Sequence, residues 1–159
     1  MTGKKFAFRS GDGLRLSVVA STMIVLFGIL GALWQSPALA GSEFSWQKDL
    51  QKGIGVAHTQ HKFVLADVYT DWCGWCKRLD ADTFSDHELQ TFLNSNFVLV
   101  KVNAEDGGAG QKAASEYGVH GYPCGLVFNQ DGRLVGRISG YKNASDYRDA
   151  LTQIMNKGK

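Results

Sequence analysis

The stretch KFVLADVYTDWCGWCK, Lys62 to Lys77, places two cysteines directly after a run of apolar residues. The run over 62–69 is rich in β-branched and aromatic side chains and predicts a strand. Cys73 and Cys76 follow where this strand gives way to a helix. The N-terminus of a helix offers unpaired N–H groups and a partial positive charge, which stabilise a thiolate. We therefore expect Cys73, at the exposed start of the helix, to be the nucleophile and Cys76 to lie one turn inside.

The C-x-x-C spacing alone is consistent with redox chemistry, metal binding or a structural disulfide. The strand before it and the helix after it favour redox chemistry. A gap of two residues on a helical turn brings the sulfurs within bonding range while leaving the bond reversible. Exchange also needs a partner that can approach the thiolate. Gly74 leaves that approach open.

The remaining sequence predicts a single α/β domain. Three further strands are expected over 97–103, 125–129 and 134–140, the last two joined by the turn signal NQDG. Four helices are also expected. The first has Trp46, Leu50, Ile54 and Ala57 on one face, and the second is capped by Ser85 or Asp86. The third covers 111–117 and ends at Gly118, and the fourth is capped by Ser145. This order predicts a mixed sheet of about four strands flanked by helices. Its first strand pairs should be parallel and its last pair antiparallel.

The first 40 residues are typical of a secretory signal peptide. Four basic residues precede an apolar run over 18–34, and small residues at Ala38 and Ala40 suit cleavage after Ala40. The alternative is an uncleaved membrane anchor, since 17 apolar residues lie at the lower limit of a spanning helix. Under both interpretations residues 41–159 form an exported domain.

Charge argues against nucleic-acid binding. Loss of residues 1–40 removes four of the 17 basic residues and one of the 15 acidic residues, which leaves a net charge of −1. No basic cluster or basic patch with interleaved aromatic residues follows. Three cysteines are too few for a disulfide scaffold, and a domain of this length does not need one. Their value is therefore expected to be chemical.

The strand, the DWCGWCK motif and the later GYP at 121–123 together resemble the thioredoxin superfamily across most of residues 44–157. The stretch over 65–93 looks most like the C-terminal periplasmic domain of the transmembrane disulfide reductase of bacteria, and like related small exported proteins. The resemblance implies that Cys73 attacks a partner, Cys76 resolves the mixed disulfide, and Pro123 faces them in a cis peptide bond. The groove for the partner would be lined by Trp72, Gly74, Trp75, Tyr122 and Cys124. The alternative for each tryptophan is a place in the core or on a plain interface surface.

The same resemblance places the buried acid of the family on Asp67 and its lysine partner on Lys101. An Asp inside FVLADVY is unusual for plain strand packing. Burial would raise its pKa, and its carboxylate could take the proton of Cys76 through water. The alternative is an Asp–Lys pair that serves structure alone.

Cys124 departs from the family pattern, in which threonine commonly follows the proline. Its simplest interpretation is a small buried residue at the start of a strand, since buried thiols are usually inert. Alternatively it lies at the groove and competes for the disulfide or the mixed intermediate. A third interpretation is a soft-metal site formed by Cys73, Cys76 and Cys124.

The function expected from this sequence is an exported thiol-disulfide oxidoreductase that reduces protein disulfides. It needs no dissociable cofactor, because electrons enter and leave by exchange with other dithiols. Its expected partners are protein disulfides and dithiols and a membrane-embedded or periplasmic redox protein, and we expect a monomer. The alternatives are an oxidase or isomerase, because the GW between the cysteines replaces the glycine-proline of cytosolic thioredoxins, and a thiolate metal-binding module.

Overall fold

The computed structural model describes residues 44–158 and confirms the predicted order of elements. The elements are α2 (Leu50–Gln60), β1 (Phe63–Tyr69), α3 (Gly74–Arg78), a π-helical turn η2 (Leu79–Thr83), α4 (His87–Asn96), β2 (Phe97–Asn103), α5 (Ala109–Glu116), β3 (Cys124–Phe128), β4 (Leu134–Ser139) and α6 (Ala144–Lys157). The predicted signal peptide over 1–40 lies outside the described residues. Within them, no helix is long and apolar enough to cross a membrane.

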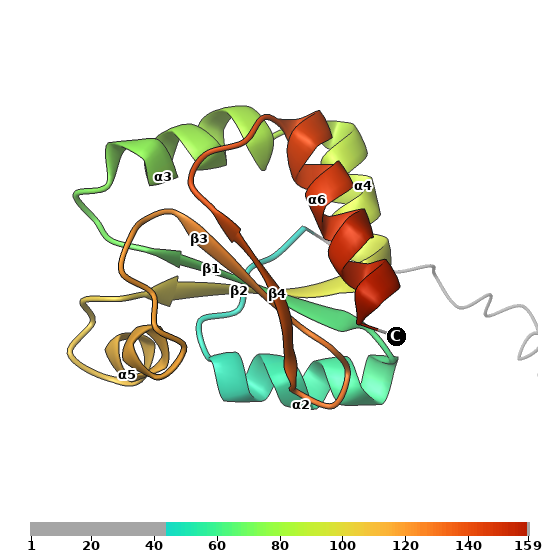
Figure 1. The fold of residues 1–159 in the computed structure, drawn as a ribbon, viewed down its shortest axis with the longest axis horizontal. Helices are drawn as coiled ribbons and strands as arrows, with labels where there is room; N and C mark the ends of the chain where they lie inside the picture. The colour runs from blue at the N-terminus through green and yellow to red at the C-terminus, as the bar shows by residue number, and fades with distance from the viewer. Residues whose placement is uncertain (1–43, 159) are drawn as a thin grey trace, which may run out of the picture. The chain divides into compact units, whose positions relative to one another are not determined.

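The four strands form one mixed sheet in the order β2-β1-β3-β4 (Figure 1). β1 runs parallel to β2, and β3 is antiparallel to both β1 and β4. β1 and β3 therefore occupy the centre, which agrees with the nearly continuous apolar sequence of β1. The predicted turn between β3 and β4 is present, with Gly132 at φ 76°, a conformation that favours glycine.

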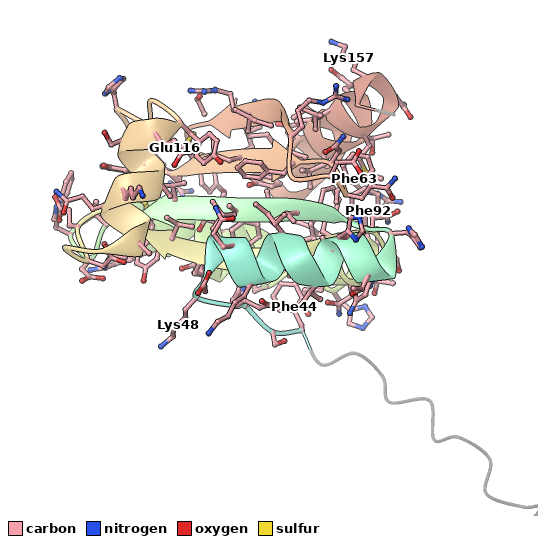
Figure 2. The ribbon with its side chains drawn as sticks, turned by 90° about the horizontal axis from the view of Figure 1, so that it is seen from below. Phe44, Lys48, Phe63, Phe92, Glu116 and Lys157 are labelled. Atoms are coloured by element: carbon pink, nitrogen blue, oxygen red, sulfur yellow. A yellow bond between two sulfur atoms is a disulfide. The ribbon has the colours of Figure 1, made fainter. Side chains whose placement is uncertain are left out.

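Two layers of helices cover the sheet, one on each face. Figure 2 views the molecule from the side of α2 and α5, which lie across one face. There Leu50, Ala57, Ala113 and Ala114 pack on alternate strand residues such as Ala66 and Val100. On the other face α4 and α6 pack on the intervening residues, with Leu93 and Leu151 fully buried beside Leu65. Each face thus buries every second side chain of a strand.

The first helix begins later than the sequence suggested. The expectation that Trp46 lies on one helical face with Leu50 is wrong, because α2 starts at Leu50 and Asp49 caps it by accepting a hydrogen bond from the backbone of Lys52. The preceding segment is extended: Gln47 donates to the Leu99 carbonyl (2.9 Å) and accepts from the Lys101 N–H (2.8 Å). Pairing with the edge of β2 therefore prevents a helical conformation at Trp46.

Two further helix ends refine the predictions. Ser85 and Asp86 were the two candidates for the cap of α4. Asp86 is the cap, because its side chain accepts a hydrogen bond from the Leu89 N–H. The prediction that Ser145 caps the last helix is wrong: Asn143 accepts from the Asp146 N–H at 2.9 Å, so α6 starts two residues earlier. Asn is as good an N-cap as Ser, and the loop after β4 decides which is used.

Two glycines of α2 provide a test of how closely this helix packs on the sheet. A Cβ at Gly53 would lie 2.5 Å from Cγ2 of the buried Val100, whereas one at Gly55 would meet no atom within 4 Å. We predict that Gly53→Ala lowers the free energy of unfolding by roughly 1–2 kcal/mol, since overpacking outweighs the gain in helix propensity. Its matched control Gly55→Ala should raise it by up to about 1 kcal/mol. Urea titration measures both, and equal effects would contradict this packing.

Candidate active site

Cys73 and Cys76 form a disulfide at the N-terminus of α3, with their Cα atoms 5.3 Å apart. Cys73 is the N-cap, and its Sγ accepts a hydrogen bond from the backbone N–H of Cys76 at 3.1 Å. An N–H directed at this sulfur stabilises negative charge on it when the bond is reduced. β1 leads into this helix, as the sequence predicted, and the connection is tightened by a hydrogen bond from the Cys73 N–H to the Thr70 carbonyl.

Cys73 is less accessible than expected. Only 5% of its surface is exposed in this disulfide form, and 3% of that of Cys76. The disulfide and the Cys76 N–H hold its sulfur over the first turn of the helix. Space is nevertheless open beside it, because a Cβ at Gly74 would meet no atom within 4 Å.

Two exposed tryptophans flank the disulfide, and each contacts a tyrosine from another loop. Trp72 is 66% exposed, lies edge-on to Tyr122 (ring centroids 6.1 Å apart), and donates from Nε1 to Glu105 at 2.8 Å. Trp75 is 56% exposed and lies 5.6 Å from the ring of Tyr141. Exposed aromatic rings held in place are suited to binding another protein.

Arg78 joins the second of these pairs. Its guanidinium lies 5.4 Å from the Trp75 ring and 5.2 Å from the Tyr141 ring, and it forms an ion pair with Asp82 at 3.0 Å. Tyr141 follows β4 in a segment that is connected to the proline loop, since the Gly140 N–H donates to the Pro123 carbonyl at 2.9 Å. The cation–π contacts of Arg78 and the hydrogen bond between Gly140 and Pro123 therefore hold the rings of Trp75 and Tyr141 in place.

Asp67 and Lys101 form the ion pair that the resemblance implied. The two residues are opposite each other in the β1–β2 register, and Nζ of Lys101 donates to Oδ2 of Asp67 at 2.6 Å. Asp67 is fully buried, while the side chain of Lys101 is 17% exposed. Lys101 also bonds Asp80, whose side chain is half exposed, so the lysine links the interior to the surface.

Burial controls the protonation of Asp67. It raises the pKa of this carboxyl above its ordinary value, and Asp80 adds to the shift, while Lys101 acts in the opposite direction. For Lys101, burial alone would lower the pKa, but Asp67 and Asp80 outweigh it and the pKa is raised. Lys101 thus keeps its positive charge, whereas Asp67 is the group that readily takes up a proton.

Aromatic rings surround the amine of Lys101. Nζ lies 4.7 Å from the ring of Trp46, 5.2 Å from that of Phe84 and 5.5 Å from that of Tyr69. Trp46 and Phe84 also contact each other edge-on at 4.9 Å. The segment that precedes α2 thereby helps to enclose the ion pair, which explains why Trp46 is held outside the helix.

β3 begins at Cys124, and Pro123 immediately precedes it. The Tyr122–Pro123 bond is cis, as the resemblance implied. Cys124 is a free thiol, 4% exposed, and it packs with Val68 and Val119 on the face of the sheet covered by α2 and α5. Asp67 lies on the opposite face, because side chains alternate along β1. Burial raises the pKa of the Cys124 thiol, although Arg137 and Ser139 oppose the shift.

This placement favours the interpretation of Cys124 as a small buried strand residue. A buried thiol that stays protonated is a poor nucleophile and a poor metal ligand. Within residues 44–158, no group of three or more His, Cys, Asp or Glu side chains is arranged to hold a metal ion. The arrangement thus gives no support to the expected alternative of a site formed by Cys73, Cys76 and Cys124.

Comparison with known proteins agrees with this geometry. Residues 50–155 match the family model of the thioredoxin-like domain. The thiol:disulfide interchange protein DsbD of Tatumella citrea is 33% identical over 123 residues, which cover 76% of this chain and 21% of that protein. DsbD of Photorhabdus laumondii is 30% identical over 102 residues, covering 62% of this chain and 18% of that protein. The chain thus spans about a fifth of the length of these curated relatives.

Two solved structures are similar over most of their length. The C-terminal domain of DsbD from Neisseria meningitidis, in the oxidised form, is 25% identical with a TM-score of 0.59, covering 69% of this chain and 98% of that one. A putative disulphide-isomerase from Bacteroides thetaiotaomicron is 28% identical with a TM-score of 0.64, covering 72% and 95%. A sheet of this topology, with a disulfide between C-x-x-C cysteines at the start of a helix, is the arrangement of a thioredoxin-like domain. The chain belongs to the thioredoxin-like domain family and is related to DsbD.

Sequence reasoning missed several contributors to this site. Asp80 bonds Lys101 from the π-helical turn that follows the cysteine pair. Tyr141 and Arg78 flank Trp75, and Trp46 covers Lys101. The π-helical turn changes the helical phase at Asp80, and the contacts of Trp75 with Tyr141 and of Lys101 with Trp46 join residues far apart in the chain. Local signals existed for two features: the three-residue spacing of Trp75 and Arg78 on one helix, and the Asp49 cap, which separates Trp46 from the helix.

The raised pKa of Asp67 predicts a specific pH dependence of stability. As pH rises through its ordinary pKa, the unfolded chain loses the proton first, so the free energy of unfolding falls until the folded carboxyl has also ionised. Asp67→Asn removes this loss. From about pH 4 upward, the stability of Asp67→Asn should therefore rise relative to that of the wild type until the folded Asp67 carboxyl has ionised.

Urea titration at a series of pH values measures this difference. The matched control is Asp149→Asn, which changes an exposed aspartate of α6 and should leave the profile parallel to that of the wild type. Parallel profiles for Asp67→Asn and the wild type would show that burial does not raise the pKa of Asp67.

Proposed function

We propose that this protein is an exported reductase of protein disulfides in which Cys73 is the nucleophile and Cys76 the resolving thiol. The observation that carries the proposal is the disulfide at the N-terminus of α3, with the Cys76 N–H directed at Sγ of Cys73. A sulfur at this position receives a backbone hydrogen bond that favours its thiolate. Reversible exchange requires such a sulfur together with a second thiol within bonding distance.

The reaction consists of two exchange steps. The thiolate of reduced Cys73 attacks one sulfur of the substrate disulfide, whose bond breaks and releases the other sulfur as a thiolate. Cys76 then loses its proton and attacks Sγ of Cys73, which restores the Cys73–Cys76 disulfide and releases the second substrate thiolate. Two electrons pass from the protein dithiol to the substrate, and the two substrate thiolates take up protons.

Asp67 is proposed as the acceptor of the Cys76 proton, and Lys101 as the group that positions it. A carboxyl whose pKa burial has raised is a stronger base than an exposed one, and general bases work best with a pKa near the operating pH. Lys101 holds Oδ2 of Asp67 in place at 2.6 Å. Among the residues that the structure describes, none donates a hydrogen bond to Oδ1, so this oxygen can take up a proton.

The surface around the disulfide is proposed as the groove for the partner protein. Trp72 contacts Tyr122, Trp75 contacts Tyr141, and a Cβ at Gly74, between the two tryptophans in sequence, would meet no described atom within 4 Å. Pro123 follows Tyr122 and supplies backbone beside the groove. Aromatic rings of this kind contribute most of the binding energy in many protein interfaces.

Export and the redox partner are proposed from the sequence and the relatives. A basic segment, an apolar run and small residues before Gly41 fit a secretory signal. Relatives named thiol:disulfide interchange protein support protein dithiols and disulfides as substrates. We propose that a membrane-embedded or periplasmic dithiol protein supplies the electrons, that no dissociable cofactor is needed, and that the protein acts as a monomer.

Trapping of the mixed disulfide tests the assignment of the two cysteines. Cys76→Ser should accumulate a covalent complex with a protein disulfide substrate such as insulin, because the resolving thiol is gone. Cys73→Ser should form no such complex. Non-reducing electrophoresis followed by peptide mapping detects the bond, which we expect at Cys73 alone.

Two outcomes would contradict the proposal. A complex linked through Cys124 would show that this thiol is reactive in spite of its burial. A reduced wild-type protein that reduces insulin no faster than free dithiothreitol would exclude a reductase and leave the oxidase or isomerase alternative.

A further inference from the structure

Tyr147 of α6 reaches from the helix to the strand position beside Asp67. The residue is 1% exposed, and its ring lies edge-on to Phe84 with the centroids 5.2 Å apart. Its hydroxyl would be 2.5 Å from a Cβ at Gly125. Gly125 is the residue of β3 that is opposite Asp67 in the sheet register. The absence of a side chain at Gly125 thus makes room for a phenol hydroxyl next to Asp67.

Within residues 44–158, two polar atoms at this place lack a hydrogen-bond partner. Oδ2 of Asp67 accepts from Lys101, but Oδ1 of Asp67 and the buried hydroxyl of Tyr147 have no partner in this part of the chain. Burying either group unpaired costs free energy, and the cost is larger for a carboxylate. The two groups occupy the same face of the sheet at neighbouring positions, so one water molecule between them would satisfy both.

We propose that Tyr147 is a positioning residue of the active site: its hydroxyl donates a hydrogen bond to a bridging water molecule, which in turn donates to Oδ1 of Asp67. This inference deepens the proposed function and rests on the role of Asp67 as the proton acceptor. The donated bond favours the carboxylate over the carboxyl and so offsets part of the effect of burial. Tyr147 thereby keeps Asp67 available as a base.

The charges around Asp67 agree with a phenol that acts as the donor. The groups that face or influence Asp67 are Lys101 from β2, Asp80 from the π-helical turn, Tyr147 from α6 and, across the sheet, Cys124 of β3. Burial raises the pKa of Tyr147, and the charges of Asp67 and Cys124 raise it further. The hydroxyl consequently keeps its proton throughout the range in which the thiols react.

Tyr147→Phe tests the inference, because it removes the hydroxyl and retains the ring. The measurement is the titration of the Asp67 carboxyl by carbon-13 NMR in the oxidised protein, where neither Cys73 nor Cys76 titrates. We expect the pKa of Asp67 to rise by about one pH unit, the equivalent of one hydrogen bond to a charged group. Tyr117→Phe is the matched control, since Tyr117 packs on Phe128 on the opposite face, and it should leave the titration unchanged.

A second variant keeps the test decisive if Tyr147→Phe fails to fold. Gly125→Ala places a methyl group where the hydroxyl lies, so it should displace the phenol and raise the pKa of Asp67 in the same direction. A titration that coincides with that of the wild type in a folded Tyr147→Phe or Gly125→Ala protein would overturn the inference.

The resolving step separates this inference from the proposed function. The rate at which Cys76 resolves the mixed disulfide depends on pH. The pH at which this rate reaches half its maximum should shift by the same amount as the pKa of Asp67. If the pKa of Asp67 shifts and the rate profile does not, the Tyr147–Asp67 contact stands and the proposed role of Asp67 fails. If neither shifts, the contact itself is overturned, and Asp67→Asn still tests the role of Asp67.

Discussion

The buried ion pair between Asp67 and Lys101 is the interaction on which the rest of this structure depends. A carboxylate at the centre of a sheet is costly unless a charged partner is close, and removal of one partner leaves the other in apolar surroundings. Lys101 is directly opposite Asp67 in the β1–β2 register. A slip of one residue would turn the lysine to the other face of the sheet. The pair thus fixes the register of the two strands that carry the site.

Disulfide exchange requires both a reactive sulfur and an acceptor for a thiol proton, and the strand that carries Asp67 brings the two together. β1 carries Asp67 in its interior and, past its end, leads to Cys73, so one strand places both the buried carboxyl and the reactive sulfur. Trp46, Phe84 and Tyr69 surround the amine of Lys101 and limit its contact with water, which strengthens its attraction to Asp67. The flanking tryptophans remain exposed at the surface, where a partner protein can reach them.

Much of this architecture could be predicted from the sequence because its signals are local. The order of strands and helices follows from apolar periodicity, and the disulfide follows from the two-residue gap at a strand–helix junction. The pairing of Asp67 with Lys101 came only from the family resemblance, since 34 residues separate the two. Trp46 was assigned to a helix because its spacing from Leu50 fits one, and its pairing with β2 is a tertiary contact that periodicity does not show. Asp80 and Tyr147 were missed for the same reason: their partners are defined by the register of the sheet.

The reduction potential of the Cys73–Cys76 couple tests the proposed direction of electron flow most directly. It is obtained by equilibrating the protein in dithiol or glutathione buffers and following tryptophan fluorescence, for which Trp72 and Trp75 lie beside the disulfide. A reductase supplied with electrons by another dithiol should have a value near that of thioredoxin, about −270 mV. A value of about −120 to −180 mV would contradict this account and indicate a disulfide donor or isomerase.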